Sequence, residues 1–180
     1  MLSISVNMDM TDRPTNHVEI LLDYSEYFEE QIARETRYVL TGIEVRIGDT
    51  FLIGGSETDF FTIDYVLDWT LPKLVECVDE ILVGNPCTVR FRDNPHDMTF
   101  TPDGDNVRIN YRDFDGQPYN PDIPSEGLAA TREATAAAII EASEEFLDRI
   151  VQIEPEIAEL DAVADLEAAL DRARDAYAEY

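Results

Sequence analysis

The chain has 180 residues, 44% of them hydrophobic, which is long enough for one real core and too apolar for a disordered protein. Its 39 Asp and Glu residues outnumber 13 Lys and Arg residues and give a net charge of −26. We therefore do not expect non-specific binding to nucleic acid, which requires a basic surface. No apolar run approaches the ~20 residues of a membrane span, so we expect no membrane partner.

The high negative charge makes the stability of the folded chain depend on the salt concentration. In ordinary salt, repulsion among the carboxylates would destabilise a compact state, but molar salt shortens the Debye length to roughly 3 Å. Acidic chains with almost no lysine, here only Lys73, resemble cytoplasmic proteins of halophilic archaea. That resemblance implies a cytoplasmic, salt-adapted protein. The alternative is an acidic protein of ordinary salt, such as a nucleic-acid mimic.

The N-terminal segment indicates a cytoplasmic location, and that location in turn sets the expectation for the two cysteines. The first ten residues lack the cationic start and apolar stretch of a signal peptide. Met1 or Met10 could be the start, and we expect residues 1–16 to form a flexible extension. In a cytoplasmic chain we expect Cys77 and Cys87 to be buried free thiols, and because they belong to no metal-binding motif we expect no zinc.

The first half of the chain predicts an antiparallel meander. We expect a strand over 17–23 and a helix over 25–36. Residues 43–53 alternate between apolar and polar around a Gly48-Asp49 turn, which is the pattern of a β-hairpin. Residues 59–63 are expected to be the next strand of the same meander.

Residues 64–84 fit more than one structure. Apolar residues from Leu71 onward have helical spacing, and Gly84 is a suitable C-terminal cap. The helix could start near Asp64 and kink at Pro72, or it could start after Thr70; the preceding strand could also continue further. In a helical reading Asp64 is an N-cap and Asp68 a solvated residue.

The second half predicts another meander and then two helices. Strands are expected over 87–93, 98–101 and 106–112, which completes a sheet domain over 17–112, and the proline-rich residues 113–126 are expected to be a linker. Helices are expected over 127–153 and 156–180, separated by Pro155. The fold class is therefore α+β: an antiparallel sheet of about five to seven strands, one central helix and a C-terminal αα-hairpin.

The last helix carries apolar residues at heptad spacing, which is typical of a helix that packs on another helix. We expect this hairpin (127–180) to pack either on its own domain or on a partner, with a homodimer as the simplest assembly. The candidate interface residues are Val163, Leu166, Leu170, Tyr177 and Tyr180.

The arginines of the second meander form the candidate binding site. Period-2 alternation places Arg90, Arg92, Arg108 and Arg112 on one sheet face, where they could bind a carboxylate-rich partner or another anion. Residues 87–112 contain four arginines and four aspartates, so this part of the chain is neutral. His96 lies in the Asn94–Asp97 turn, where we expect it to face the solvent.

No catalytic or metal-binding motif is found in the sequence. It contains no nucleophile elbow, no P-loop and no dinucleotide-binding glycine pattern. The acidic stretch around Gly116 does not match an EF-hand, because Tyr111 and Asp122 occupy its first and last ligand positions. We therefore assign no catalytic residue, no metal and no cofactor.

Two functions follow from these observations. The first is a non-enzymatic interaction or regulatory (adaptor) protein of a halophilic archaeon, which uses the C-terminal helices and the arginine-bearing sheet face. The alternative is a small-molecule or nucleotide-binding module, which could also be an enzyme. Its pocket would lie between the sheet and helix 64–83 and would be lined by Tyr65, Trp69 and the arginines.

Overall fold

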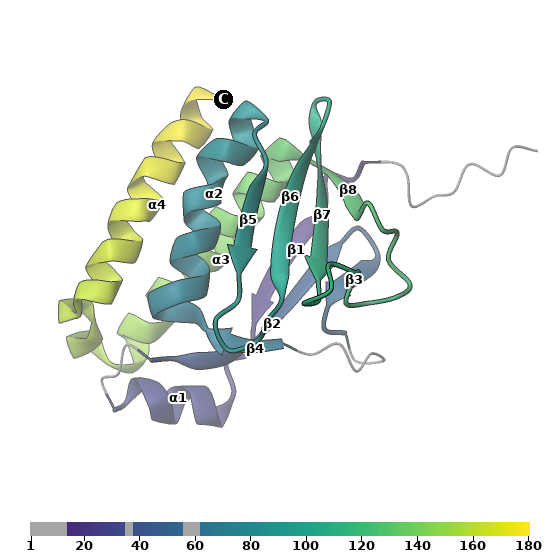
Figure 1. Ribbon diagram of the computed structural model, residues 1–180. Helices are drawn as coiled ribbons and strands as arrows, with labels where there is room; N and C mark the ends of the chain where they lie inside the picture. Colours follow the sequence, from purple (N-terminus) through teal and green to yellow (C-terminus); the bar gives the residue numbers. More distant parts are fainter. Residues whose placement is uncertain (1–13, 35–37, 56–61) are drawn as a thin grey trace, which may run out of the picture.

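The computed structural model describes residues 14–34, 38–55 and 62–180. These residues form two antiparallel four-stranded sheets, four α-helices and two short helical turns (Figure 1). The predicted α+β class is confirmed, including the central helix and the C-terminal helix pair.

The first sheet is built around its longest strand, β2. Its strands are β1 (Val18–Leu22), β2 (Leu40–Ile47), β3 (Thr50–Ile53) and β4 (Thr62–Tyr65). The β2–β3 hairpin is confirmed, with Ile47 opposite Thr50 and Gly48 at φ 60° in the turn. Helix α1 (Glu26–Ile32) connects β1 to β2 and buries Phe28 and Ile32.

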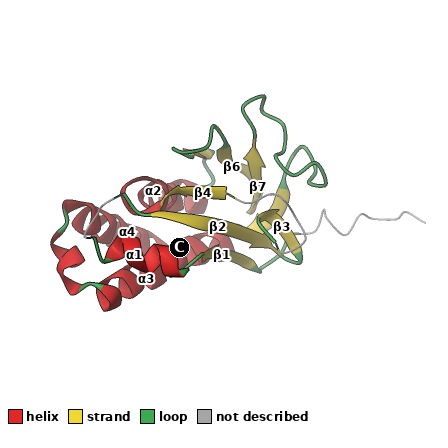
Figure 2. Ribbon diagram, turned by 90° about the horizontal axis from the view of Figure 1, so that it is seen from below, coloured by secondary structure: helices red, strands yellow, loops and turns green. Residues whose placement is uncertain are grey.

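The predicted meander is wrong for the last strand of this sheet. β4 pairs with residues 40–43 of β2, whereas β3 pairs with residues 45–47, and β1 occupies the opposite edge. β3 and β4 therefore lie end to end along β2, as Figure 2 shows. Alternation within each strand is the same in both arrangements, so the pattern could not separate them. Most of the predicted strand 59–63 lies outside the described residues.

The second sheet has the order β5-β6-β7-β8. Its strands are β5 (Cys87–Arg90), β6 (Asp97–Asp103), β7 (Asn106–Arg112) and β8 (Leu128–Thr131). The β5–β6–β7 meander agrees with the sequence prediction, but residues 128–131 are a strand and not the start of a helix. Gly127, at φ 90°, lies so close to β7 that a Cβ there would collide with the Ile109 carbonyl oxygen. The chain therefore turns onto the edge of β7 before the helix begins.

Residues 113–126, predicted to be a linker, fold against the sheets. The Tyr119 backbone N–H donates to the Tyr111 carbonyl at 2.8 Å, and the Asn120 amide donates to the Phe51 carbonyl at 3.3 Å. Ile123 is buried in the same core as the sheets and helices. Of the predicted N-terminal extension, residues 1–13 lie outside the described residues, whereas Thr15 bonds to both sides of Ala130 in β8, at Ala129 and Thr131.

The helices form a layer beside the sheets. They comprise a π-helical turn (Val66–Thr70), α2 (Leu71–Val83), α3 (Arg132–Ile153), a 3₁₀ turn (Pro155–Glu159) and α4 (Asp161–Glu179). α2 lies between α4 and strand β5 (Figure 1). Thr131 caps α3 through the Ala134 N–H, and Gly84 ends α2 at φ 80°. None of the described helices is both long and apolar enough to cross a membrane.

The heptad-spaced residues of α4 pack within the chain itself. Val163, Leu166 and Leu170 are each 0% exposed in the common core, where α4 contacts α2 and α3. Tyr177 is half-buried, and Tyr180 is exposed. The three aliphatic residues therefore offer no surface to a second molecule in this structure.

The cysteines are not the free thiols that we expected. Cys77 of α2 and Cys87 of β5 form a disulfide, with their Cα atoms 5.9 Å apart. The prediction rested on a cytoplasmic location and on ten-residue spacing, and spacing cannot show that α2 returns beside the next strand. The disulfide ties α2 to the edge of the second sheet.

Candidate functional site

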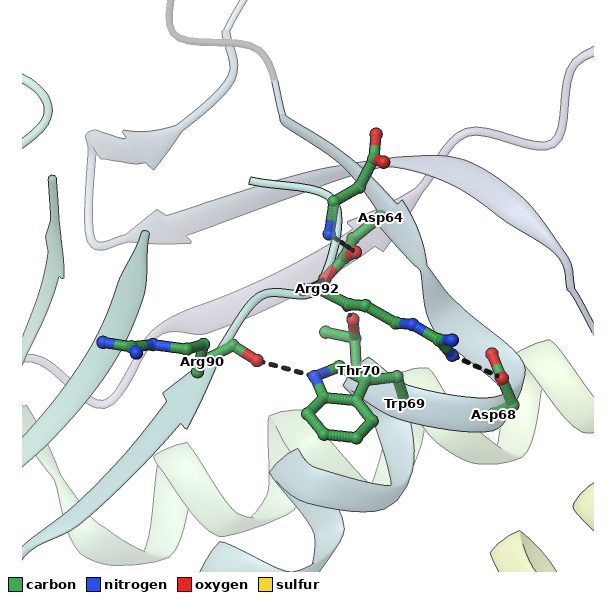
Figure 3. Close-up of polar contacts among 7 residues, drawn as sticks. Asp64, Asp68, Trp69, Thr70, Arg90 and Arg92 are labelled. Carbon is green, nitrogen blue, oxygen red and sulfur yellow. Dashed lines mark hydrogen bonds and ion pairs between the residues drawn. The ribbon is translucent and has the colours of Figure 1, made fainter. Parts of the chain in front are cut away.

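A fully buried carboxylate, Asp64, organises the region between the two sheets. It lies in β4 and accepts hydrogen bonds from the backbone N–H groups of Arg92 at 2.8 Å and Asp93 at 2.7 Å. The Thr70 hydroxyl donates to the same carboxylate at 2.8 Å (Figure 3). Three donors compensate for the loss of water around a buried charge. Asp64 is thus an anchor for a distant loop, and its predicted role as a helix N-cap is wrong.

The anchored loop, residues 91–96, joins the two sheets. Strand β5 ends at Arg90, and after the Phe91 N–H, which donates to the His96 carbonyl at 3.0 Å, the backbone N–H groups turn away from the second sheet. Asp64 accepts two of them, and the Asn94 amide donates to the Ile63 carbonyl at 2.7 Å. The loop therefore binds along β4 of the first sheet.

Arg92 is held over aromatic rings by this anchoring. Its guanidinium carbon lies 5.2 Å from the centre of the Tyr65 ring and 5.9 Å from the centres of the Tyr38 and Trp69 rings. Its Nη1 forms an ion pair with Asp68 Oδ2 at 2.9 Å. We call Arg92, Asp68, Tyr38, Tyr65 and Trp69 the Arg92 cluster. The Arg92 guanidinium is therefore held both by cation–π contacts with the rings and by a charge-assisted hydrogen bond to Asp68.

The π-helical turn supplies two members of this cluster. Asp68 and Trp69 come from its five residues, and the Trp69 indole N–H donates to the Arg90 carbonyl at 2.7 Å. β5 is an edge strand, so the indole covers a backbone acceptor that would otherwise be open to another strand. The Asp68 side chain is only 13% exposed, and its Oδ1 has no hydrogen-bond partner within the described residues. The prediction of a solvated Asp68 is wrong.

The Arg92 cluster forms one end of a groove between α2 and α4, with a volume of about 580 Å³. We call it the α2–α4 groove. Its lining includes Tyr38, Trp69 and Arg92, then Lys73 and Glu76 of α2, and Asp161, Asp165, Ala168, Ala169 and Arg172 of α4. Lys73 pairs with Glu76 at 2.6 Å. The groove is therefore mixed in charge. Although the chain is very acidic, the groove contains three cationic side chains, those of Lys73, Arg92 and Arg172.

The predicted alternative pocket is only partly found. Trp69 lines the α2–α4 groove, which opens between two helices and not between a helix and a sheet. Tyr65 belongs to the Arg92 cluster behind it. Tyr38, which the sequence analysis did not single out, contributes the third ring.

The four predicted arginines contact groups of the chain itself. Arg90 binds both oxygens of Asp97 at 2.9 and 3.0 Å, and Arg108 binds Asp103 at 2.9 Å. Arg112 donates to the carbonyls of Gly116 and Ser125, both at 2.9 Å, within the segment that folds over β7. Arg92 has left the sheet because β5 ends at Arg90. The structure therefore separates Arg92 from the other three.

His96 is not the solvent-facing residue that a turn predicts. Its ring packs 4.4 Å from the centre of the Tyr119 ring and 5.2 Å from that of Tyr111. Burial lowers the pKa of His96 from its ordinary value of 6.5, against the opposing effects of Asp113 and Asp97. Its Nδ1 is buried and unpartnered among the described residues. His96 is therefore half-buried and packs against Tyr111 of β7 and Tyr119 of the segment 113–126.

Neither metal chemistry nor a relative supplies a function. Within residues 14–34, 38–55 and 62–180, no three His, Cys, Asp or Glu side chains come together as a metal site. No family model, curated protein or solved structure matches this chain. We therefore base the function on the geometry of the α2–α4 groove.

Proposed function

We propose that this protein is a non-catalytic interaction protein that docks a partner protein in the α2–α4 groove. The observation that carries the proposal is the fixed Arg92 cluster at the end of the groove. Asp64 holds the backbone of Arg92, and three rings and Asp68 hold its side chain. A wall that is rigid before binding loses little conformational entropy when a partner arrives.

The shape of the groove favours a polypeptide over a small ligand. Along α4 it runs from Asp161 to Arg172, which corresponds to about 16 Å of helix. Arg92 already lies over the Tyr65 and Trp69 rings, so a flat ligand would have to displace a paired cation from them. A helix or extended segment can instead lie along the groove and contact Trp69, Pro72 and the alanines of α4.

The proposal includes molar salt as the working solvent. A net charge of −26 repels most acidic partners in dilute salt, and screening removes that barrier at high ionic strength. A halophilic archaeon provides such a solvent. The Cys77–Cys87 disulfide is of a kind found mainly in oxidising compartments, so it does not support a cytoplasmic location. The cytoplasmic location stays a sequence-based prediction.

Filling the groove tests the proposal. Ala168 is exposed and lines the groove, so Ala168→Trp should block it without disturbing the core. Ala178→Trp adds the same side chain to an exposed position of α4 outside the groove lining and serves as the matched control. Immobilised protein in molar KCl should retain a defined partner when it is wild type or Ala178→Trp, and lose it when it is Ala168→Trp. Equal retention by all three proteins would overturn the proposal.

A further inference from the structure

We infer that the partner in the α2–α4 groove is a second copy of this chain, with the two α4 helices antiparallel across a two-fold axis. The inference rests on the proposed function, because it assigns an occupant to the same groove. It differs from the dimer predicted from the sequence, since Val163, Leu166 and Leu170 are buried within the chain. The surface now proposed is the opposite face of α4.

That face carries a charge pattern at helical spacing. Asp161, Asp165, Ala168 and Arg172 follow each other at intervals of four, three and four residues, and therefore lie in one stripe along α4. All four are exposed and line the groove. Within the part of the chain that the structure describes, Asp161, Asp165 and Arg172 form no ion pair.

The pattern is complementary to itself when the helices run in opposite directions. If Ala168 and Ala169 lie at the centre of the pairing, Asp165 faces Arg172 of the partner subunit. The two-fold axis repeats that contact, so each dimer contains it twice. In the same register Asp161 faces Ala176 of the partner subunit, and Asp175 faces Ala162 of the partner subunit.

A parallel pairing would be repulsive. Each acidic residue of the stripe would then lie opposite its own copy, and Arg172 would lie opposite Arg172 of the partner subunit. Like charges at contact oppose association, so the sequence of charges along α4 selects the antiparallel arrangement. This is the charge complementarity that identifies a second copy as the occupant.

The shape of the groove suits a helix as its occupant. The α4 side is lined by Ala162, Ala168 and Ala169, whose small side chains let a second helix approach closely. The other wall is α2, where Pro72 and Trp69 provide apolar contact. The α4 helix of each subunit would lie between α2 and α4 of the other, which gives a four-helix interface.

Salt should control this association. Each subunit carries a charge of −26, so the two copies repel each other at low ionic strength. Molar salt screens that long-range repulsion, while the four charges paired at contact are screened less once they are partly buried. The dimer fraction should therefore increase from dilute buffer to molar KCl.

Two charge reversals test the geometry directly. Asp165→Arg gives a stripe with Arg at 165 and 172, and Arg172→Asp gives one with Asp at both positions. Each variant alone places like charges at both contacts, so its self-association should weaken at least about tenfold. An equimolar mixture restores Asp opposite Arg at both contacts. We expect the mixture, and not either variant alone, to form the dimer in molar KCl.

Light scattering after size-exclusion chromatography gives the mass, to be compared with 20.4 kDa for one subunit. Urea unfolding confirms that both variants fold, which we expect because both residues are exposed. A wild-type protein that stays monomeric in molar KCl at high concentration would overturn the inference. Variants that each dimerise like the wild type, or a mixture no more dimeric than its components, would also overturn it.

The two proposals fail in different ways. If the wild type is monomeric and Ala168→Trp still abolishes binding of another protein, the groove is a docking site for that protein and only the present inference is wrong. If Ala168→Trp changes neither the mass nor the binding of any partner, both proposals are wrong.

Discussion

Asp64 and Arg92 lie 28 residues apart in sequence, and the buried carboxylate of the first accepts a 2.8 Å hydrogen bond from the backbone N–H of the second. The bond connects β4 of one sheet to the loop that leaves β5 of the other. It also fixes the starting point of the Arg92 side chain, which then reaches over three rings to Asp68. The fold and the candidate site therefore depend on the same carboxylate.

Replacing this carboxylate should destabilise the whole chain. In Asp64→Asn an amide NH₂ takes the place of one acceptor oxygen and faces N–H donors, so a buried charge-assisted bond is lost and a donor is left without a partner. We expect a loss of about 3 kcal/mol in the free energy of unfolding. Urea unfolding in molar KCl measures it. Asp93→Asn is the matched control, since only the backbone N–H of Asp93 takes part, and an equally large loss there would contradict the assignment.

The Arg92–Asp68 ion pair should show measurable coupling. Asp68 is mostly buried, but Arg92 is about half exposed, so solvent screening limits the pair to about 1 kcal/mol. A double-mutant cycle with Arg92→Met and Asp68→Asn isolates that energy from urea unfolding curves. The exposed Arg90–Asp97 pair gives the reference cycle and should couple less. Equal coupling in both cycles would show that burial beside the aromatic rings adds nothing.

Acidification should destabilise the protein partly through His96. Burial lowers the pKa of His96 below 6.5, so the unfolded chain binds a proton more readily than the folded protein does. The stabilisation from the neutral ring is therefore present above pH 6.5 and is lost as the pH falls below that value. His96→Phe keeps the ring contacts with Tyr111 and Tyr119 and removes the titration.

The difference between His96→Phe and wild type isolates this effect from the many carboxylates. We expect the free energy of unfolding of wild type to fall more steeply than that of His96→Phe between pH 7 and pH 5. Parallel curves would show that the ring is protonated equally well in the folded and unfolded states.

Reduction of the disulfide should lower stability without unfolding the protein. Cys77 and Cys87 close a loop of ten residues, and opening it restores chain entropy in the unfolded state worth about 2–3 kcal/mol. Thermal unfolding with and without a dithiol reductant measures the loss. Cys77→Ala combined with Cys87→Ala should be insensitive to the reductant. A wild type that is equally insensitive would show that the bond does not form in solution.

Local patterns predicted much of the fold. The alternation around Gly48 located the β2–β3 hairpin, and the turn residues of 94–97 and 102–106 separated β5, β6 and β7. These features depend on neighbours in sequence. Residues 128–131 were assigned to a helix because Leu128, Ala129 and Ala130 are acceptable in either structure. Their strand conformation comes from the long-range contact of Gly127 with Ile109.

The site was harder to predict because its parts are distant in sequence. The alternation in Thr62-Ile63-Asp64-Tyr65 places Ile63 and Tyr65 on the apolar face and Asp64 on the polar one, whereas in the structure Ile63 is 41% exposed and Asp64 is fully buried. Nothing local indicates that the donors to Asp64 belong to residues 92 and 93. Arg92 was grouped with Arg90 by alternation, which stops applying where β5 ends.

The central claim is that the α2–α4 groove is where this protein binds a partner, and site-specific photo-crosslinking in molar KCl tests it most directly. A small aliphatic diazirine amino acid of about the size of leucine, too small to fill the groove as tryptophan does, should give a covalent protein–protein adduct in place of Ala168 and none in place of Ala178. A second Asp64→Asn substitution should reduce the adduct, because it releases Arg92 from the wall of the groove. No adduct from position 168, or equal adducts from both positions, would contradict the claim.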